Sequence, residues 1–108
     1  MITVTADLKH MKMKIEGHDT QDNGNGESLL CNSVSTLFYA LCYTVALRDS
    51  DKENLISRTI NASKGNASIE ICPEAYARLG YSAILDHYLS GFKMLAAEHP
   101  DRLEVIEV

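Results

Sequence analysis

Apolar and polar residues alternate in two short segments near the N-terminus, over residues 1–7 and 11–16. Alternation with a period of two predicts a β-strand that buries one face. The segment Leu8-Lys9-His10 between them is short enough for a tight turn, so we expect a β-hairpin. The apolar positions of the two strands are Ile2, Val4, Ala6, Met11, Met13 and Ile15.

Two longer segments, residues 27–48 and 82–98, place apolar side chains three or four residues apart. Such a stripe is typical of an α-helix that packs on a core. Ser28 is a suitable N-cap for the first helix, and His99-Pro100 ends the second. The stripes are Leu30, Val34, Leu37, Phe38, Leu41 and Val45 in the first helix, and Ile84, Leu85, Tyr88, Leu89, Phe92 and Leu95 in the second.

Three further segments, residues 55–62, 67–72 and 103–108, have the composition of strands. The turn between the first two contains Gly65, and Pro73 ends the second. The predicted order of elements is therefore ββαββαβ. This order predicts an α+β fold, in which both helices pack on a mostly antiparallel sheet of about five strands.

The length, the net charge and the cysteine content of the chain limit the classes of protein to which it can belong. A chain of 108 residues suits one domain, and we expect residues 1–108 to form a single one. The formal net charge is −5 and there is no basic block, which argues against direct binding of nucleic acid. The chain has no uninterrupted run of about 18 apolar residues and no signal-peptide pattern at its start. The three cysteines lack the spacing of a disulfide framework. We therefore expect a cytoplasmic protein without a membrane segment.

Cys31 is the first candidate for chemistry. If Ser28 is the N-cap, Cys31 is the third residue of the first helix. A thiol there lies near unpaired backbone N–H groups and the positive end of the helix dipole, which both stabilise the nucleophilic thiolate. The same N–H groups could hold the oxyanion that forms when a thiolate attacks an amide. The alternative reading is a small, partly buried apolar residue.

His18 is a candidate partner, because it ends the second predicted strand while Cys31 begins the next helix. Residues 19–26 between them are rich in turn formers and could bring these two ends together. A histidine in contact with a cysteine can take its proton and return it to a leaving amine. The alternative reading of residues 19–26 is a plain connector.

Other chemistry finds less support in the sequence. Cys42, eleven residues further along the same helix, is expected in the core, and Cys72 is expected to be structural. A calcium loop that began at Asp19 would need glutamate at its twelfth position, where the chain has Leu30. No zinc-ligand spacing and no phosphate-binding loop is present. The sequence thus predicts no metal site and no cofactor.

The segments Gly17-His18, Leu30-Cys31 and Val34-Ser35-x-Leu37, with a loop containing Gly26 between the first two, resemble the Prp family of bacterial ribosomal-processing cysteine proteases. Further along, Gly91-Phe92-x-Met94-Leu95 followed by His99-Pro100 is also similar to that family. The resemblance covers nearly the whole chain, and its specific motifs are concentrated between Gly17 and Leu37.

The resemblance implies a His–Cys dyad, with Cys31 as the nucleophile and His18 as the base. Ser35 matches a serine of the family motif, and both Ser35 and Ser28 would support the site. The implied substrate is the N-terminal extension of a large-subunit ribosomal protein precursor, and the family forms homodimers. The loop that would act as a gate contains Asp19, Asn23, Gly24 and Gly26.

The chain departs from the family pattern around the dyad. Asp19 replaces the usual alanine after the histidine, and Ser28 replaces the usual acidic residue three before the cysteine. Asn32 and Ser33 replace two alanines that follow the cysteine. These departures keep two alternatives open: a diverged, prophage-borne relative that processes a capsid or scaffold protein, and an inactive peptide-binding protein. A third alternative, a thiol redox sensor, follows from the reactive thiol expected at Cys31.

Overall fold

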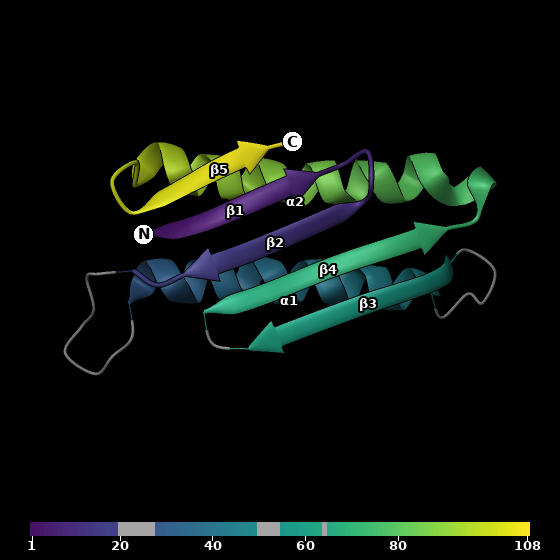
Figure 1. Ribbon diagram of the computed structural model, residues 1–108, viewed down its shortest axis with the longest axis horizontal. Coiled ribbons are helices and arrows are strands. Elements are labelled where there is room, and N and C mark those ends of the chain that lie inside the picture. The colour runs from purple at the N-terminus through teal and green to yellow at the C-terminus, as the bar shows by residue number, and fades with distance from the viewer. Residues whose placement is uncertain (20–27, 50–54, 64) are drawn as a thin grey trace.

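The computed structural model describes residues 1–19, 28–49, 55–63 and 65–108 (Figure 1). The elements follow one another in the order β1 (Ile2–Asp7), β2 (Lys12–Gly17), α1 (Leu29–Asp49), β3 (Leu55–Ser63), β4 (Asn66–Pro73), η1 (Ala75–Ala77), α2 (Arg78–Glu98) and β5 (Leu103–Glu107). The predicted order ββαββαβ is confirmed, with the single 3-10 turn η1 added before the second helix.

The five strands form one sheet in the order β3-β4-β2-β1-β5. Three neighbouring pairs are antiparallel, and β1 pairs with β5 in parallel. The prediction of a mostly antiparallel sheet is therefore confirmed, and the parallel pair makes the sheet mixed. In the register of the central strands, Val4 lies opposite Ile15 on β2 and opposite Val105 on β5.

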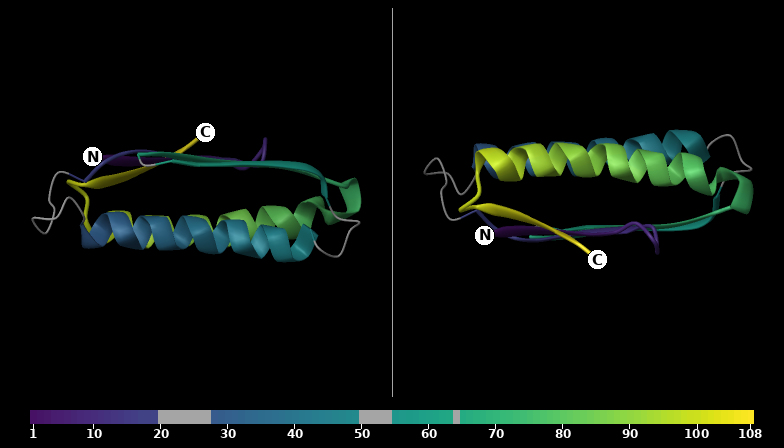
Figure 2. Two further views of the ribbon diagram at one scale, coloured as in Figure 1. Left: turned by 90° about the horizontal axis from the view of Figure 1, so that it is seen from below. Right: turned by 90° about the horizontal axis from the view of Figure 1, so that it is seen from above.

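Both helices cover the same face of the sheet, and the other face has no covering layer among the described residues (Figure 2). Alternation along β1 and β2 explains this arrangement, because the apolar side chains of each strand point to the helices while threonines, lysines and acids point away. Between the two layers lies one apolar core. Its largest fully buried side chains are Phe92, Met11, Met13, Leu41, Ile69, Leu85, Leu89, Leu103, Val4 and Val45.

The predicted helix stripes are largely confirmed, but their edges are not fully buried. Leu37, Ile84 and Tyr88 are only partly buried and pack against the rim of the core. Helix α2 begins at Arg78, four residues before the predicted start at residue 82. Gly80 does not interrupt it because the turn η1 leads directly into the helix, and the next residue, Tyr81, is buried in the core.

Helix α1 is long and apolar enough, by length and composition, to cross a membrane. In the structure one face of α1 packs on the sheet, through Leu30, Val34, Phe38, Leu41 and Val45. A helix that covers a sheet with one apolar face can have the same length and mean hydropathy.

Candidate active site

Four segments meet at one end of the sheet, around a cleft of about 490 Å³. They are the start of β1, the end of β2 with the two residues that follow it, the start of α1, and the β3–β4 turn with its flanking residues. The cleft brings together every described residue for which the sequence predicted a role: His18, Asp19, Ser28, Cys31 and Ser35. The predicted gate residues Asn23, Gly24 and Gly26 lie outside the described residues.

Ser28 caps helix α1, as the sequence predicted. Its Oγ accepts a hydrogen bond of 2.8 Å from the backbone N–H of Cys31, and its carbonyl oxygen accepts one from Asn32. Ser28 is buried, whereas Cys31 is half-buried and lines the cleft. The cap corrects one expectation, because the N–H of Cys31 is already bonded and is not free to hold an oxyanion. Other N–H groups of the first turn would have to do so.

Gly17 turns the chain so that His18 leaves strand β2 toward the cleft. The φ angle of Gly17 is +96°, and a Cβ atom there would clash with the carbonyl oxygen of Met1. Glycine is the residue that adopts this conformation without strain. The N–H of Gly17 also donates to the carbonyl of Gly65 at 3.0 Å, which ties the end of β2 to the β3–β4 turn.

The imidazole ring of His18 lies directly over Gly65. A Cβ atom on Gly65 would approach Cε1 of this ring to 2.6 Å and Nε2 more closely still. Gly65 itself has a φ of +78°, so both its conformation and its neighbour require glycine. The β3–β4 turn therefore forms the surface against which the histidine ring rests.

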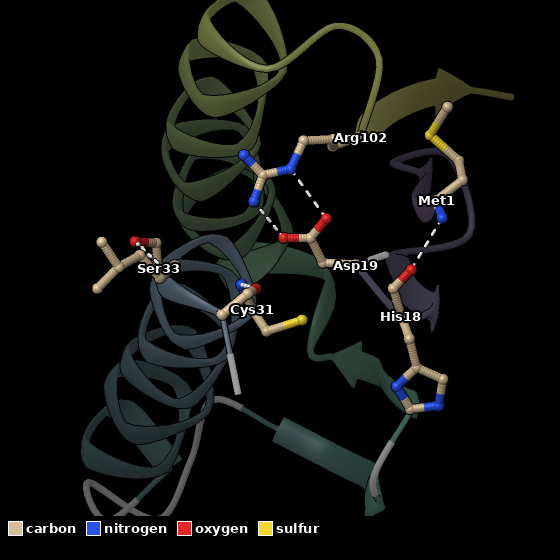
Figure 3. Close-up of polar contacts among 8 residues, drawn as sticks. Met1, His18, Asp19, Cys31, Ser33 and Arg102 are labelled. Atoms are coloured by element: carbon tan, nitrogen blue, oxygen red, sulfur yellow. Dashed lines mark hydrogen bonds and ion pairs between the residues drawn. The ribbon is translucent and has the colours of Figure 1, made fainter. Parts of the chain in front are cut away.

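His18 and Cys31 lie on the two sides of the same cleft. Figure 3 shows the Cys31 sulfur directed toward the side on which the His18 ring lies. No hydrogen bond joins these two side chains, both of which belong to the described part of the chain. Catalytic hydrogen bonds are often open in the absence of substrate, so this placement is compatible with a dyad that closes on a bound peptide.

Asp19 does not orient His18; its carboxylate pairs with Arg102 instead (Figure 3). Nε of Arg102 donates to Oδ1 at 2.9 Å, and Nη2 donates to Oδ2. The Asp19 side chain has no exposed surface, and that of Arg102 is 21% exposed. The hydrogen bonds that Arg102 donates to Asp19 raise the pKa of Arg102 above its ordinary value, and the charge of Cys31 adds to this effect.

Sequence reasoning missed Arg102 as a residue of this region. A buried carboxylate needs a cationic partner, and Asp19 stands where the resembling family has alanine. The partner lies 83 residues further along the chain, however, at the start of β5. No local pattern indicates that these two residues meet.

No protein-family model matches this chain, and no curated protein matches it by sequence. Solved structures do match over its full length. The essential ribosomal processing protease Prp from S. aureus, in complex with a covalently linked product peptide, superposes with a TM-score of 0.76 at 16% identity, covering 100% of both chains.

The chain has the fold of Prp.

The same S. aureus protease in complex with a substrate peptide gives a TM-score of 0.74 at 13% identity, again covering 100% of both chains. SMU.848 from Streptococcus mutans gives 0.65 at 16% identity, covering 99% of this chain and 91% of that one. The resemblance to the Prp family that was drawn from Gly17-His18 and Cys31 is thus confirmed at the level of the fold.

Within the Prp fold, the three cysteines of this chain have different surroundings. Cys42 packs against the core as predicted, and burial raises the pKa of its thiol. Cys72, expected to be structural, is exposed near the end of β4. Among the described residues, no three His, Cys, Asp or Glu side chains form a group that could hold a metal ion.

Proposed function

We propose that this protein is a cysteine endopeptidase that removes a short N-terminal extension from a large-subunit ribosomal protein precursor. The observation that carries the proposal is the position of Cys31, in the capped first turn of α1, across one cleft from His18. The Prp fold supports it, because the S. aureus protein with this fold is a ribosomal processing protease whose two structures are complexes with a product peptide and a substrate peptide.

In the proposed reaction His18 takes the thiol proton of Cys31, and the thiolate attacks the carbonyl carbon of the scissile peptide bond. N–H groups of the first turn of α1, other than that of Cys31, stabilise the oxyanion of the tetrahedral intermediate. The carbon–nitrogen bond then breaks, and the leaving amine takes the proton from His18. Water, deprotonated by His18, hydrolyses the thioester and regenerates the thiol.

The lining of the cleft is compatible with an extended peptide. Its apolar part includes residues from four elements: Ile2, Ile15, Val34, Phe38 and Ala67. Its polar part includes Ser28, Asn32, Ser35, Ser63 and Asn66. Pockets that bind ligands combine an apolar lining with a few polar groups that fix orientation. An apolar side chain of the substrate would lie against the first set while its backbone meets the second.

The test is cleavage of a ribosomal protein precursor that carries an N-terminal extension, followed by mass spectrometry of the products. Wild type should release the extension, whereas Cys31→Ala and His18→Ala should each lose at least about 1,000-fold in rate. Cys72→Ala is the matched control, because it removes an exposed thiol outside the cleft, and it should cleave like wild type. Equal rates in Cys31→Ala and wild type would contradict the proposal.

A second candidate function follows from the polar residues at the cleft. Ser28 and Asn32 line it where the resembling family has other residue types. A change of this kind favours a different substrate, such as a phage capsid or scaffold protein with a similar extension, or binding of a peptide without cleavage. Wild type that binds the ribosomal extension but does not cut it, and that cuts no phage precursor, would favour the binding protein.

We further propose that the protein acts in the cytoplasm as a homodimer, as the resemblance implies. In support, the outer face of α1 exposes apolar side chains one helical turn apart, at Tyr39, Tyr43 and Leu47. Light scattering during size-exclusion chromatography should give twice the 12.0 kDa mass of the chain. Tyr43→Glu should lower this mass if the face belongs to the dimer contact.

A further inference from the structure

Two Arg–Asp ion pairs lie at the opposite ends of α1, and they differ in burial. Asp49 and Arg58, at the end of α1 and on β3, are both about one-third exposed. The side chain of Asp19 has no exposed surface, and that of its partner Arg102 is 21% exposed. A surface pair contributes little to stability, whereas a buried carboxylate that loses its partner is strongly unfavourable. Loss of Arg102 should therefore disturb its surroundings, which include the cleft with His18 and Cys31, more than loss of Arg58 would.

The chain on both sides of this pair is held by backbone hydrogen bonds. The amino nitrogen of Met1 donates to the carbonyl of His18 at 2.8 Å, immediately before Asp19. The carbonyl of Arg102 accepts from the N–H of Ile2, also at 2.8 Å. The pair thus joins the segment that carries His18 to the start of β5, across the first residues of β1. A displacement of Arg102 would remove its contact with Asp19, which is one of the contacts that hold the segment carrying His18.

The pair also sets the charge near Cys31. Asp19 and Cys31 line the same cleft, and the Arg102 guanidinium lies close enough for the charge of Cys31 to affect its pKa (Figure 3). Without the Arg102 guanidinium, the negative charge of Asp19 would disfavour a second negative charge at the Cys31 sulfur. In the ion pair, the positive charge of Arg102 offsets that of Asp19.

We propose that Arg102 is a positioning residue of the candidate active site, which holds the Asp19 carboxylate, and with it the segment carrying His18, while it neutralises the charge that Asp19 brings to Cys31. The inference rests on the proposed function for the roles of His18 and Cys31. One of its two readouts, the reactivity of the Cys31 thiol, needs no substrate and no peptidase activity.

The first readout is alkylation of each cysteine by iodoacetamide at pH 7, followed by peptide mass spectrometry. Arg102→Gln removes the cationic partner of Asp19, and the Cys31 rate should fall about tenfold, as expected for one nearby like charge. The double variant Asp19→Ala/Arg102→Gln removes both charges and should return to within about threefold of wild type. Cys72, exposed and outside the cleft, is the internal control and should keep its rate in every variant.

The second readout is cleavage of the extended precursor by Arg102→Lys. Lysine keeps the positive charge but cannot reproduce the two-pronged contact with a carboxylate. Alkylation of Cys31 should therefore stay near wild type, while kcat falls about tenfold because His18 is less well placed. An unchanged alkylation rate together with a lower kcat would distinguish the positioning role of Arg102 from the effect of its charge. The same variant tests the proposal if Arg102→Gln does not fold. Arg58→Gln breaks the exposed pair and should leave both readouts unchanged.

The proposal is overturned if folded Arg102→Gln alkylates at Cys31 as fast as wild type, or if the double variant is as slow as Arg102→Gln. It is also overturned if Arg102→Lys cleaves at the wild-type rate. If wild type cleaves no precursor at all, the proposed function fails, but the alkylation rates of the three variants still decide the effect of Arg102 on Cys31.

Discussion

The two ends of helix α1 use the same residue types for different purposes. At its end, Asp49 and Arg58 form an exposed pair that connects the helix to β3. At its start, the buried pair of Asp19 and Arg102 lies beside a cleft that also contains Cys31. The comparison shows that the residue types of an ion pair do not reveal its importance. Its burial does, because loss of one partner costs much more free energy in a buried pair than in an exposed one.

The largest loss of cleavage activity should come from Gly65→Ala. This substitution changes the cleft at the start of α1 and leaves the Asp49–Arg58 pair at the other end of the helix untouched. The new Cβ would overlap the His18 ring, and the φ of +78° is unfavourable for alanine. Displacement of a catalytic group by about 1 Å can lower a rate about 100-fold, so we expect a loss of this size in precursor cleavage. Alkylation of Cys31, which lies on the other side of the cleft, should change much less.

Gly80→Ala is the matched control for this prediction. Gly80 is in α2, where a Cβ atom would meet nothing within 4 Å. Alanine is a better helix former than glycine, so this variant should gain up to about 1 kcal/mol in free energy of unfolding. Its cleavage rate should equal that of wild type. A similar loss of activity in both glycine variants would show that the contact with His18 is not the cause.

The next largest effect is a difference in alkylation rate between Cys31 and Cys42, which both belong to α1. Burial raises the pKa of Cys42, so its thiolate fraction at pH 7 is small and increases only as the pH rises toward the raised pKa. Cys31 lies in the first turn and lines the cleft, and it should alkylate at least about tenfold faster at pH 7. The ratio of the two rates should fall as the pH is raised. A ratio of one at pH 7 would remove the distinction between the two positions.

A smaller effect is expected from the cap of α1. Ser28→Ala removes the acceptor for the N–H of Cys31 and should lower the free energy of unfolding by about 1 kcal/mol in urea titrations. Ser33 lies one turn further on, and its Oγ donates to the carbonyl of Leu29, a contact that contributes little to helix stability. Ser33→Ala should therefore be nearly neutral. Equal losses in the two variants would mean that Ser28 does not act as a cap.

The smallest effect should come from Arg58→Gln at the other end of α1. Exposed ion pairs contribute about 1 kcal/mol or less, and salt screens them. We expect a change in the free energy of unfolding within this range, which decreases in 1 M NaCl, and no change in cleavage. A loss of activity would mean that the two ends of the helix are coupled, contrary to the contrast drawn above.

The elements that could be predicted from sequence are those with a regular period. The alternation in β1 and the apolar stripe of α1 identify their buried faces because each pattern repeats with the geometry of its element. The parallel pairing of β1 with β5 is different. It depends on how α2 returns the chain to the edge of the sheet, and neither strand carries a local sign of its neighbour.

The site shows the same limit. Ser28 and Cys31 are three residues apart, so the cap between them follows from the sequence. The contact of His18 with Gly65 joins two turns that the chain brings together only through the sheet. The partner of Asp19 could not be predicted either, because only the folded sheet places β5 beside the residues that follow β2.

The position of Arg102 has a consequence for the timing of activity. His18 and Cys31 belong to the first third of the chain, whereas Arg102 immediately precedes β5, the last element in chain order. A polypeptide folds from its N-terminal end as it is synthesised, and contacts between distant segments form late. Asp19 therefore acquires its Arg102 partner only after the segment that precedes β5 has been made. By the proposal above, a chain that has not yet formed this contact would hold His18 less firmly and would cleave more slowly than the folded protein.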